Sequence, residues 1–339
     1  MTADKAFVRM QVLKETARMD RNSRIFVAGH RGLVGSAILR RLTEAGHTDL
    51  VIRDRSQLDL TDQAAVRAFF DREGIEQVIL AAAKVGGILA NDRFGGDFIR
   101  DNLLIQNNVI DAAWRAGVKK LLFLGSSCLY PKHAEQPIKE EALLTGEMEP
   151  SNKPYAVAKI AGITMCQAYR RQYGFNAICA MPSNLYGPGD HFEPETSHAL
   201  PGMIRRFHDA KVAGDPTVTL WGTGTPRREF LYVDDMADAC LHLMDHYDSG
   251  EIINVGPGED IAISSLAASI RDTVGYTGTL THDLSKPDGH PRKLMDVSRL
   301  FATGWRPKVS LEEGLRRTYD WFLENAAPER RQAPKQAAE

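Results

Sequence analysis

The sequence is poor in cysteine, in unbalanced charge and in long apolar runs, and each lack argues against a class of protein. Its 339 residues include 4 cysteines and no CxxC pair, which argues against a zinc site or a disulfide framework and favours a reduced, cytoplasmic location. The formal net charge of −2 argues against a nucleic-acid surface, which would carry clustered excess lysine and arginine. No apolar run reaches about 18 residues, so neither a membrane span nor a membrane partner is predicted.

A glycine-rich segment follows the first predicted strand. Residues 24–28 form a short run that is apolar after Arg24, the next seven have the spacing GxxGxxG, and residues 36–45 have helical periodicity. Glycines in this setting allow a tight turn and let the backbone approach a pyrophosphate at the helix N-terminus. A glycine turn without a ligand is the less favoured alternative. The residues expected to contact a dinucleotide are Gly29, His30, Arg31, Gly32, Leu33, Val34 and Gly35.

The residues after the second predicted strand, over 50–53, bear on the choice of nucleotide. An acidic side chain binds the ribose 2′-hydroxyl of NAD, whereas an arginine accommodates the 2′-phosphate of NADP. Arg55 lies just past this strand, and Arg31 lies in the glycine segment. Two guanidinium groups therefore predict NADP(H), although Asp54 leaves NAD open.

Apolar strands alternate with amphipathic helices along the first half of the chain. Strands are predicted over 77–83 and 119–124, with a long helix over 98–117 between them. This alternation predicts an α/β fold with a doubly wound parallel sheet, in which ligands gather at the carboxyl ends of the strands. Ser126, Ser127 and Cys128 stand at one such end.

Tyr155 and Lys159 lie four residues apart on a predicted helix over 154–173, so their side chains share a face. An ammonium group near a phenol favours the phenolate, and we expect it to lower the pKa of Tyr155. Such a phenol can give a proton to a carbonyl oxygen while a hydride moves. The spacing also occurs on ordinary solvated helices, so the glycine segment and the Ser126–Cys128 strand end carry the catalytic interpretation.

The glycine segment, the Ser126–Cys128 strand end and the Tyr155–Lys159 pair together resemble those of one known family. The chain resembles the extended short-chain dehydrogenase/reductases, and most closely their 3,5-epimerase-4-reductase branch, which acts on GDP-4-keto-6-deoxymannose with NADPH. The resemblance runs from Gly29 to about residue 300, through GHRGLVGSAI, AAAKVGGI, LLFLGSSCLYP, NKPYAVAKIAG, MPSNLYGPGD, SHALPGMIRRFHDA, LWGTGTPRREFLYVDDMA and KPDGHPRKLMDVSRL.

The resemblance implies a Rossmann-type sheet with a smaller C-terminal α/β substrate domain. About two domains also suit the length. The expected parts are an N-terminal extension over 1–22, an NADP-binding domain over 23–184, a mainly substrate-binding domain over 185–325 with interleaved segments, and a polar tail over 326–339. A homodimer is implied, with the helices over 98–117 and 154–173 pairing across a two-fold axis.

The implied chemistry assigns roles to individual residues. A ketone at sugar carbon 4 acidifies the protons on carbons 3 and 5, so epimerisation needs a base on one face and an acid on the other. The resemblance makes Cys128 the base and His198 the acid, whereas the residues alone favour a buried thiol and a surface histidine. It makes Tyr155 the proton donor to the ketone oxygen, with Ser126 hydrogen-bonding that oxygen and Lys159 supporting the tyrosine.

Further residues are expected at the cofactor. Asp59 and Leu60 open a turn that could meet the adenine, and the alternative for Asp59 is an N-cap on a helix over 63–72. The resemblance adds further cofactor-binding residues, most of which lie at strand ends. These are Ala82, Leu124, Gly125, Ser126, Ser127, Lys159, Pro182, Ser183, Asn184, Leu185 and His198.

The substrate residues implied by the resemblance are Arg206, Trp221, Arg228 and Asp288. Arginine binds phosphate bidentately, and an indole stacks on a base or sugar, although the residues alone allow solvated arginines and a core tryptophan. The loop over 286–293 is expected to close over the diphosphate. No metal is predicted, because Asp234 and Asp235 lack a third ligand and are interpreted as the N-cap of a helix over 236–246.

Two alternative functions stay open. One is a nucleotide-sugar 4-epimerase or 4,6-dehydratase with retained NAD, although a dehydratase would need an acidic pair where this chain has Ser127 and Cys128. The other is a non-catalytic regulator that senses NADP(H). Such proteins often lose the catalytic tyrosine or lysine, and this chain keeps both.

Overall fold

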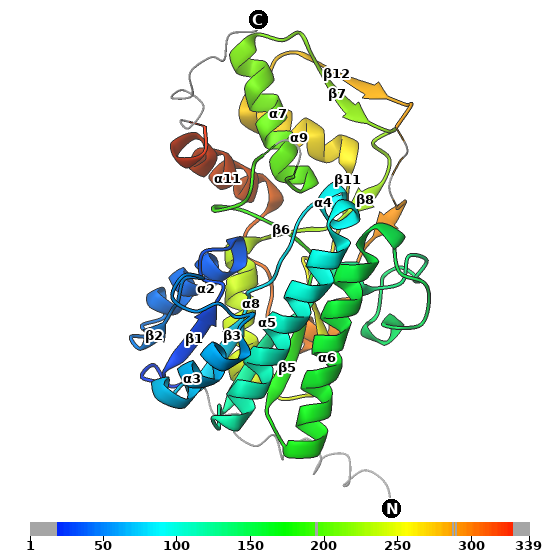
Figure 1. The fold of residues 1–339 in the computed structure, drawn as a ribbon. Coiled ribbons are helices and arrows are strands. Elements are labelled where there is room, and N and C mark those ends of the chain that lie inside the picture. The colour runs from blue at the N-terminus through cyan, green and yellow to red at the C-terminus, as the bar shows by residue number, and fades with distance from the viewer. Residues whose placement is uncertain (1–18, 194–195, 287, 289, 328–339) are drawn as a thin grey trace, which may run out of the picture.

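The computed structural model describes residues 19–193, 196–286, 288 and 290–327. Its centre is a six-stranded sheet in the order β10-β5-β4-β3-β1-β2 (Figure 1). Every pairing in it is parallel, which confirms the predicted fold class. The strands are β1 (Ile25–Ala28), β2 (Leu50–Val51), β3 (Gln77–Leu80), β4 (Lys120–Leu124), β5 (Ala177–Pro182) and β10 (Ile252–Val255).

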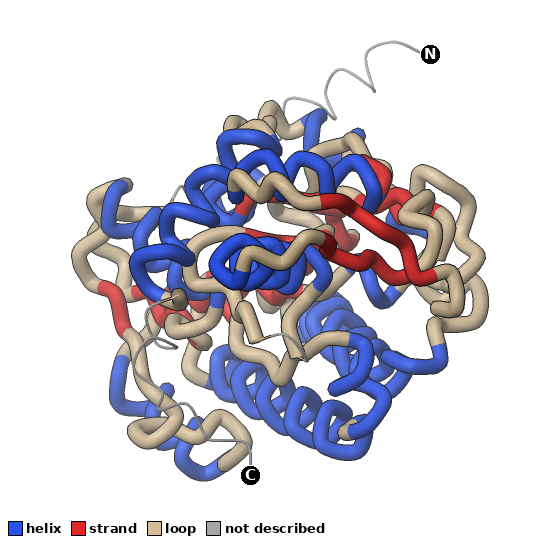
Figure 2. The backbone as a smooth tube through the Cα atoms, turned by 90° about the horizontal axis from the view of Figure 1, so that it is seen from above, coloured by secondary structure: helices blue, strands red, loops and turns tan. Residues whose placement is uncertain are grey.

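Helices cover both faces of this sheet, as the buried apolar strands require. One face packs on α2 (Leu33–Glu44) and α8 (Val233–His246). The other packs on α3 (Gln63–Glu73), α5 (Gly95–Arg115) and α6 (Lys153–Tyr173). The long helices α5 and α6 lie side by side, and the view from above shows helices on either side of the strands (Figure 2). We call this part the large-sheet region.

A second part, the small lobe, has its own apolar core. Its helices are α7 (Ala199–Ala213), α9 (Ile263–Val274) and α11 (Leu311–Asn325). Its strands are β7 (Thr217–Trp221), β8 (Arg227–Arg228), β11 (Ile261–Ala262), β12 (Thr279–Asp283) and β13 (Arg292–Lys293). The pair β6 (Asn184–Tyr186) and β9 (Phe230–Tyr232) connects the two parts.

The chain passes between the two parts more than once. After α7, β7 and β8 it returns through β9 to α8 and β10 in the large-sheet region, and then enters the small lobe again with β11 and α9. The remaining elements are α4 (Ile88–Arg93), α10 (Ser298–Ala302) and three short 3-10 helices (Ser127–Leu129, Glu140–Ala142 and Pro150–Asn152). In the described part, no helix has the length and apolarity to cross a membrane.

The structure excludes one capping alternative and contradicts one capping prediction. The N-cap of α3 is Asp62, whose side chain accepts from Ala65 N, and not Asp59. The helix predicted over 236–246 begins at Val233, so Asp234 and Asp235 lie in its first turn. There an acidic side chain favours the helix dipole.

The two aspartates of α8 instead join it to its neighbours. Asp234 forms an ion pair with Arg40 at 2.7 Å. Asp235 accepts hydrogen bonds from the backbone N–H groups of Lys308 and Val309.

The loop predicted over 286–293 is shorter than expected, because its last two residues form the strand β13 and pair with β8. Of the predicted N-terminal extension and polar tail, residues 1–18 and 328–339 lie outside the described residues.

Candidate active site

The glycine segment forms a cradle that side chains would fill. Gly29 has a φ of +88°, and a Cβ on Gly35 would lie 2.1 Å from the Gly29 carbonyl oxygen. Helix α2 begins directly after Gly32, which has no side chain to cap it. The first N–H groups of a helix lack internal partners, so they are available to a phosphate here.

Charged side chains surround the mouth of this cradle. Arg31 Nη2 lies 2.6 Å from Asp54 Oδ2, and His30 Nε2 lies 3.2 Å from Asp54 Oδ1. Arg55 lies 3.5 Å from Asp59. The Arg31 and Arg55 side chains are 77% and 78% exposed, so both guanidinium groups can reach a 2′-phosphate. Each arginine is paired with one aspartate, Arg31 with Asp54 and Arg55 with Asp59.

The turn predicted to meet the adenine is internally hydrogen-bonded. Asp59 accepts from the N–H and the hydroxyl of Thr61 at 2.9 and 2.7 Å, and these two hydrogen bonds, led by the backbone N–H, lower its pKa. Asn108 donates to the carbonyl of Leu60 at 3.0 Å. Ala82 lies against the cradle, because a Cβ on Gly29 would be 2.6 Å from its nitrogen.

The end of β4 brings three predicted catalytic residues together. Gly125 continues the strand, with its N–H 2.7 Å from the Ala180 carbonyl. Ser126 Oγ then accepts from Cys128 N at 3.2 Å and starts a 3-10 helix. The Ser126 hydroxyl also hydrogen-bonds the Tyr155 phenol. Ser126, Cys128 and Tyr155 therefore form one cluster.

The pKa prediction for Tyr155 is wrong in this structure. Burial and the negative charge of the Cys128 thiolate raise the pKa of Tyr155, and the Ser126 hydrogen bond opposes them only in part. Lys159 lies elsewhere, with its ammonium 4.0 Å from the ring centre of Phe123. Burial lowers the pKa of Lys159 to about 7. Since this lysine is only partly charged, it exerts a weak field on the phenol.

The pKa of Cys128 is shifted in the opposite direction to that of Tyr155. The nearby Lys293 ammonium lowers the pKa of the Cys128 thiol more than any other group does. Burial opposes it, while the Ser126 hydroxyl and the Arg228 guanidinium lower the pKa further. A thiol with a lowered pKa can act as a base near neutral pH. Lys293 was not among the predicted site residues, although it ends the motif PDGHPRK.

The loop after β3 packs against the segment that carries His198. A Cβ on Gly87 would lie 3.1 Å from the Ser197 carbonyl oxygen, and the Gly87 N–H points at the Thr196 carbonyl at 3.4 Å. His198 is the N-cap residue of α7. Desolvation of the imidazole by the surrounding protein lowers the pKa of His198, and the charge of His191 lowers it further. His198 thus approaches the strand ends from the small lobe.

The end of β5 carries the remaining predicted cofactor contacts, Pro182, Ser183, Asn184 and Leu185. Ser183 N donates to the Val255 carbonyl at 2.9 Å, and Asn184 Nδ2 donates to the Glu229 carbonyl at 2.9 Å. The Ser183 hydroxyl is buried and has no hydrogen-bond partner in the described part of the chain. Such a hydroxyl suits a polar ligand group at this strand end. Leu124 and Ser127 are buried beside it, at the end of β4.

Three of the four predicted substrate residues gather at the end of β7. Arg206 donates to the Thr219 carbonyl at 3.1 Å, and Asp288 accepts from the Thr223 N–H and hydroxyl at 2.8 and 2.7 Å. Trp221 is 62% exposed, which excludes the core interpretation. An indole this exposed is typical of a ligand surface. Arg228 lies apart on β8, where it donates to the His290 carbonyl and faces Cys128.

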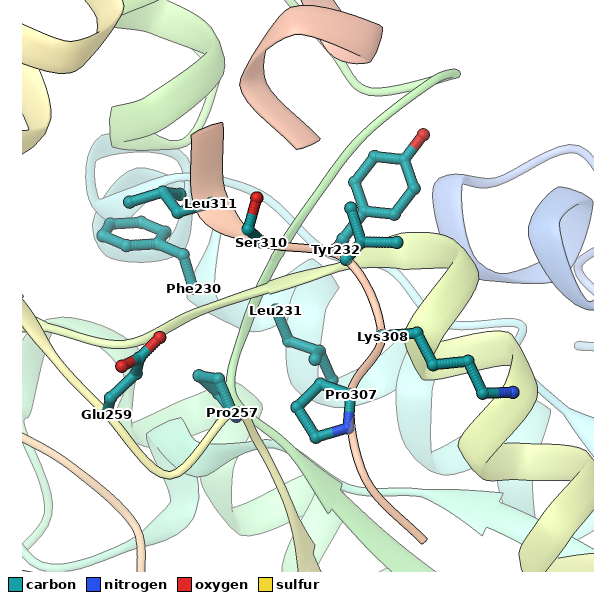
Figure 3. Close-up of a pocket in the computed structure, with 10 residues that line it drawn as sticks. Phe230, Leu231, Tyr232, Pro257, Glu259, Pro307, Lys308, Ser310 and Leu311 are labelled. Carbon is teal, nitrogen blue, oxygen red and sulfur yellow. The ribbon is translucent and has the colours of Figure 1, made fainter. Parts of the chain in front are cut away.

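Two other kinds of site, a metal centre and a separate pocket, are less well supported by the structure. In the described part of the chain, no group of three or more His, Cys, Asp or Glu side chains could hold a metal ion. A pocket of about 190 Å³ lies between β9 and the loop over 307–311 (Figure 3). None of the predicted site residues lines it, and Lys308 extends away from it toward its ion-pair partner Asp238.

The parallel sheet, the glycine cradle and the Ser126–Cys128–Tyr155 cluster define a Rossmann-type dinucleotide-binding protein with an acid–base site. Residues 25–256 match the NAD dependent epimerase/dehydratase family. The chain belongs to that family, which confirms the resemblance found in the motifs.

Individual relatives give a more specific comparison than the family as a whole. The chain is 60% identical over 306 residues to GDP-L-fucose synthase 1 of Arabidopsis thaliana, covering 90% of this chain and 95% of that protein. It is 54% identical over 311 residues to GDP-L-fucose synthase of Escherichia coli, covering 89% and 97%. The solved structure of a GDP-L-fucose synthetase from Naegleria fowleri bound to NADP is 30% identical, with a TM-score of 0.85, covering 92% and 97%.

Proposed function

We propose that this protein catalyses the NADPH-dependent 3,5-epimerisation and 4-reduction of GDP-4-keto-6-deoxymannose to GDP-L-fucose. The observation that carries the proposal is the cluster at the end of β4, where a thiol with a lowered pKa adjoins a phenol with a raised pKa. A reductase alone needs only the phenol, whereas an epimerase also needs a base. The names of the two GDP-L-fucose synthases compared above agree with this assignment.

The chain fits NADP(H) on observations of its own. The cradle excludes a side chain at Gly35, α2 begins without a side-chain cap, and the largely exposed Arg31 and Arg55 lie at its mouth. Lys159 and the strand-end residues 182–185 would hold the nicotinamide ribose and ring. When bound, NADPH supplies the hydride for the reduction.

Each catalytic side chain then has a defined proton task. Cys128 as thiolate removes the proton from carbon 3 or carbon 5, and His198 returns a proton from the opposite face. Ser126 and Tyr155 hydrogen-bond the ketone oxygen and stabilise the enolate between these steps. Because its pKa is raised, Tyr155 stays protonated at neutral pH and can give its proton to this oxygen during the reduction.

The same proposal includes binding of the nucleotide and the assembly state. Arg206, Trp221 and Asp288 hold the GDP moiety, while Arg228 faces the reacting sugar. The protein is a cytoplasmic homodimer, divided into a cofactor domain over 23–184 and a mainly substrate-binding domain over 185–325. The dimer proposal is supported by exposed apolar side chains on α5 and α6, namely Leu104, Val157 and Tyr173, which would be covered by a second copy.

The decisive assay follows NADPH oxidation with GDP-4-keto-6-deoxymannose in deuterated water. Oxidation with deuterium at both carbon 3 and carbon 5 of the product is the expected result. Oxidation without deuterium would reduce the function to 4-reduction and remove the roles of Cys128 and His198. Stoichiometric NAD retained through purification would instead favour a 4-epimerase or 4,6-dehydratase. Tight NADPH binding without turnover of any 4-keto nucleotide sugar would favour a sensor.

A matched variant separates the two chemistries. Cys128→Ala is expected to abolish deuterium incorporation while NADPH still binds with unchanged affinity, because Cys128 lies at the strand end and not in the cradle. Full epimerisation by this variant would contradict the assignment of the base. Cys240→Ala is the control, since Cys240 is buried in α8 on the other side of the sheet.

A further inference from the structure

Two cations reach Cys128 from neighbouring strands. Lys293 on β13 is the register partner of Arg228 on β8. Residues at the same register of paired strands project from the same face of a sheet, so the two side chains point the same way. The Lys293 ammonium hydrogen-bonds the thiol, and Arg228 adds a second positive charge.

The backbone beside Lys293 is anchored to the segment that carries the thiol. Leu294 N donates to Gln136 Oε1 at 2.8 Å, and Ile138 N donates to the Leu294 carbonyl at 2.7 Å. Residues 136–138 continue the segment that begins at Cys128. One stretch of chain therefore carries the thiol and fixes the lysine that faces it.

Glu229 is hydrogen-bonded to the chain two residues after Lys293. It is 1% exposed, its Oε1 accepts from Met295 N at 3.0 Å, and its Oε2 has no partner among the described residues. Burial raises the pKa of Glu229 to about 8, against the charge of Lys293. At neutral pH this carboxyl is therefore mostly protonated, and it does not neutralise the lysine.

We propose that Lys293 holds Cys128 as a thiolate for the epimerisation. In that step the C–H bond beside the ketone breaks, its electron pair forms the enolate, and the proton moves to Cys128 Sγ. Lys293 acts through Cys128 and is therefore a positioning residue. The inference rests on the proposed function for its role in turnover, whereas the pairing of lysine and thiol is a property of the protein alone.

The first test needs no substrate. The rate at which iodoacetamide alkylates Cys128 is measured against pH, with Cys128→Ser as the blank, because the other three cysteines are buried. Lys293→Met is expected to raise the pKa of the thiol by about one unit, and Lys293→Arg to restore most of the shift. Lys293→Gln serves if the methionine variant does not fold. Lys119→Met is the control, since Lys119 pairs with Glu76 at the opposite end of β4.

The second test separates epimerisation from hydride transfer. In Lys293→Met, deuterium incorporation at carbons 3 and 5 should fall about tenfold, in proportion to the lost thiolate. The first-turnover transfer of hydride from GDP-L-fucose to NADP⁺, which precedes epimerisation in the reverse direction, should change far less. A lower rate of both steps together would point to a general loss of structure and would overturn the proposal.

An unchanged thiol pKa in Lys293→Met would also overturn the proposal. If only the KM for the GDP-sugar then rose, Lys293 would be a ligand of the diphosphate and nothing more. Failure of the proposed function is recognised separately. A wild-type protein without turnover but with a Lys293-dependent thiol pKa would refute the GDP-sugar assignment and leave the lysine–thiol pair standing.

Discussion

In the large-sheet region the candidate site is built from backbone, whereas in the small lobe it is built from paired side chains. The glycine cradle depends on contacts such as that between Gly35 and the Gly29 carbonyl, which no side chain could replace. The strands β8 and β13 have two residues each, and Asp260 joins them through ion pairs to Arg227 and Arg292. Backbone geometry fixes the cofactor side, and charge pairing fixes the substrate side.

The two kinds of construction should respond differently to substitution. A cradle made of backbone tolerates almost no added atom, because neighbouring main-chain atoms cannot move away cheaply. A surface made of ion pairs can lose one partner and keep its fold, since partly exposed pairs are screened by water. Cys128 and Tyr155 lie at the border, and both kinds of contact set their chemistry.

The largest effect is expected at Tyr155, at the border between the large-sheet region and the small lobe. Tyr155→Phe keeps the ring and removes the proton donor, so hydride transfer should fall by about 10²–10⁴-fold. Stopped-flow NADPH oxidation measures the loss, and a fluorescence titration should show unchanged NADPH affinity. The control is Tyr247→Phe, because the Tyr247 hydroxyl donates to the Glu251 carbonyl and this residue lies near Lys120, at the opposite end of β4. Near wild-type hydride transfer by Tyr155→Phe would remove the tyrosine from the mechanism.

The next effect tests the backbone cradle. Gly35→Ala places a methyl group 2.1 Å from the Gly29 carbonyl oxygen, so the free energy of unfolding should fall by about 1–3 kcal/mol. NADPH affinity should fall with it, about tenfold or more, as isothermal titration calorimetry can measure. Gly96→Ala is the control, because a Cβ there meets open space. A stable Gly35→Ala protein with full NADPH affinity would contradict a cradle fixed by backbone contacts.

A smaller effect is expected on the substrate side. Asp260→Asn removes the charge between Arg227 and Arg292, and hydrogen bonds to charged groups contribute about 1.5–3 kcal/mol. We expect the KM for the GDP-sugar to rise roughly tenfold while the Kd for NADPH stays unchanged. The control is Asp272→Asn, whose side chain is 67% exposed. Equal losses for both ligands would mean that the two halves are not independent.

The smallest effect concerns pH. The pKa of Glu229 is raised from 4.5 to about 8, so between these values the folded chain binds more protons than the unfolded chain. Stability contributed by this group is therefore lost as pH rises through that window. From about pH 7 to 8 the wild type should lose about 1 kcal/mol more than Glu229→Gln. Parallel urea denaturation curves at the two pH values would measure this, and identical pH profiles would show that Glu229 is already ionised.

The sequence predicted the large-sheet region well because its strands are continuous apolar runs. The strand β4 was predicted within one residue of its observed bounds, as was the helix α6. The start of α8 was missed because Val233 continues an apolar strand pattern, and the helix begins before the aspartates that resemble a cap. Such a boundary depends on where neighbouring loops donate hydrogen bonds, in this case at Lys308 and Val309.

The candidate site was predictable in its parts but not in its electrostatics. Motif spacing placed Ser126, Cys128 and Tyr155 together, since parallel strand ends share one edge. Lys293 escaped because its approach to Cys128 depends on the register of two short strands about 65 residues apart in sequence. The pKa of Tyr155 was misjudged because spacing along a helix does not reveal that Lys159 is buried and directed at Phe123.

The repeated crossing of the chain between the two parts limits how this protein could be recombined. Since α8 and β10 interrupt the small lobe in sequence, no single cut separates a cofactor module from a substrate module. A new substrate surface could not be grafted as one continuous insert, and at least two segments would have to change together. Diversification within this architecture is therefore expected to proceed by substitution at individual positions, such as those around β7 and β13, and not by exchange of whole domains.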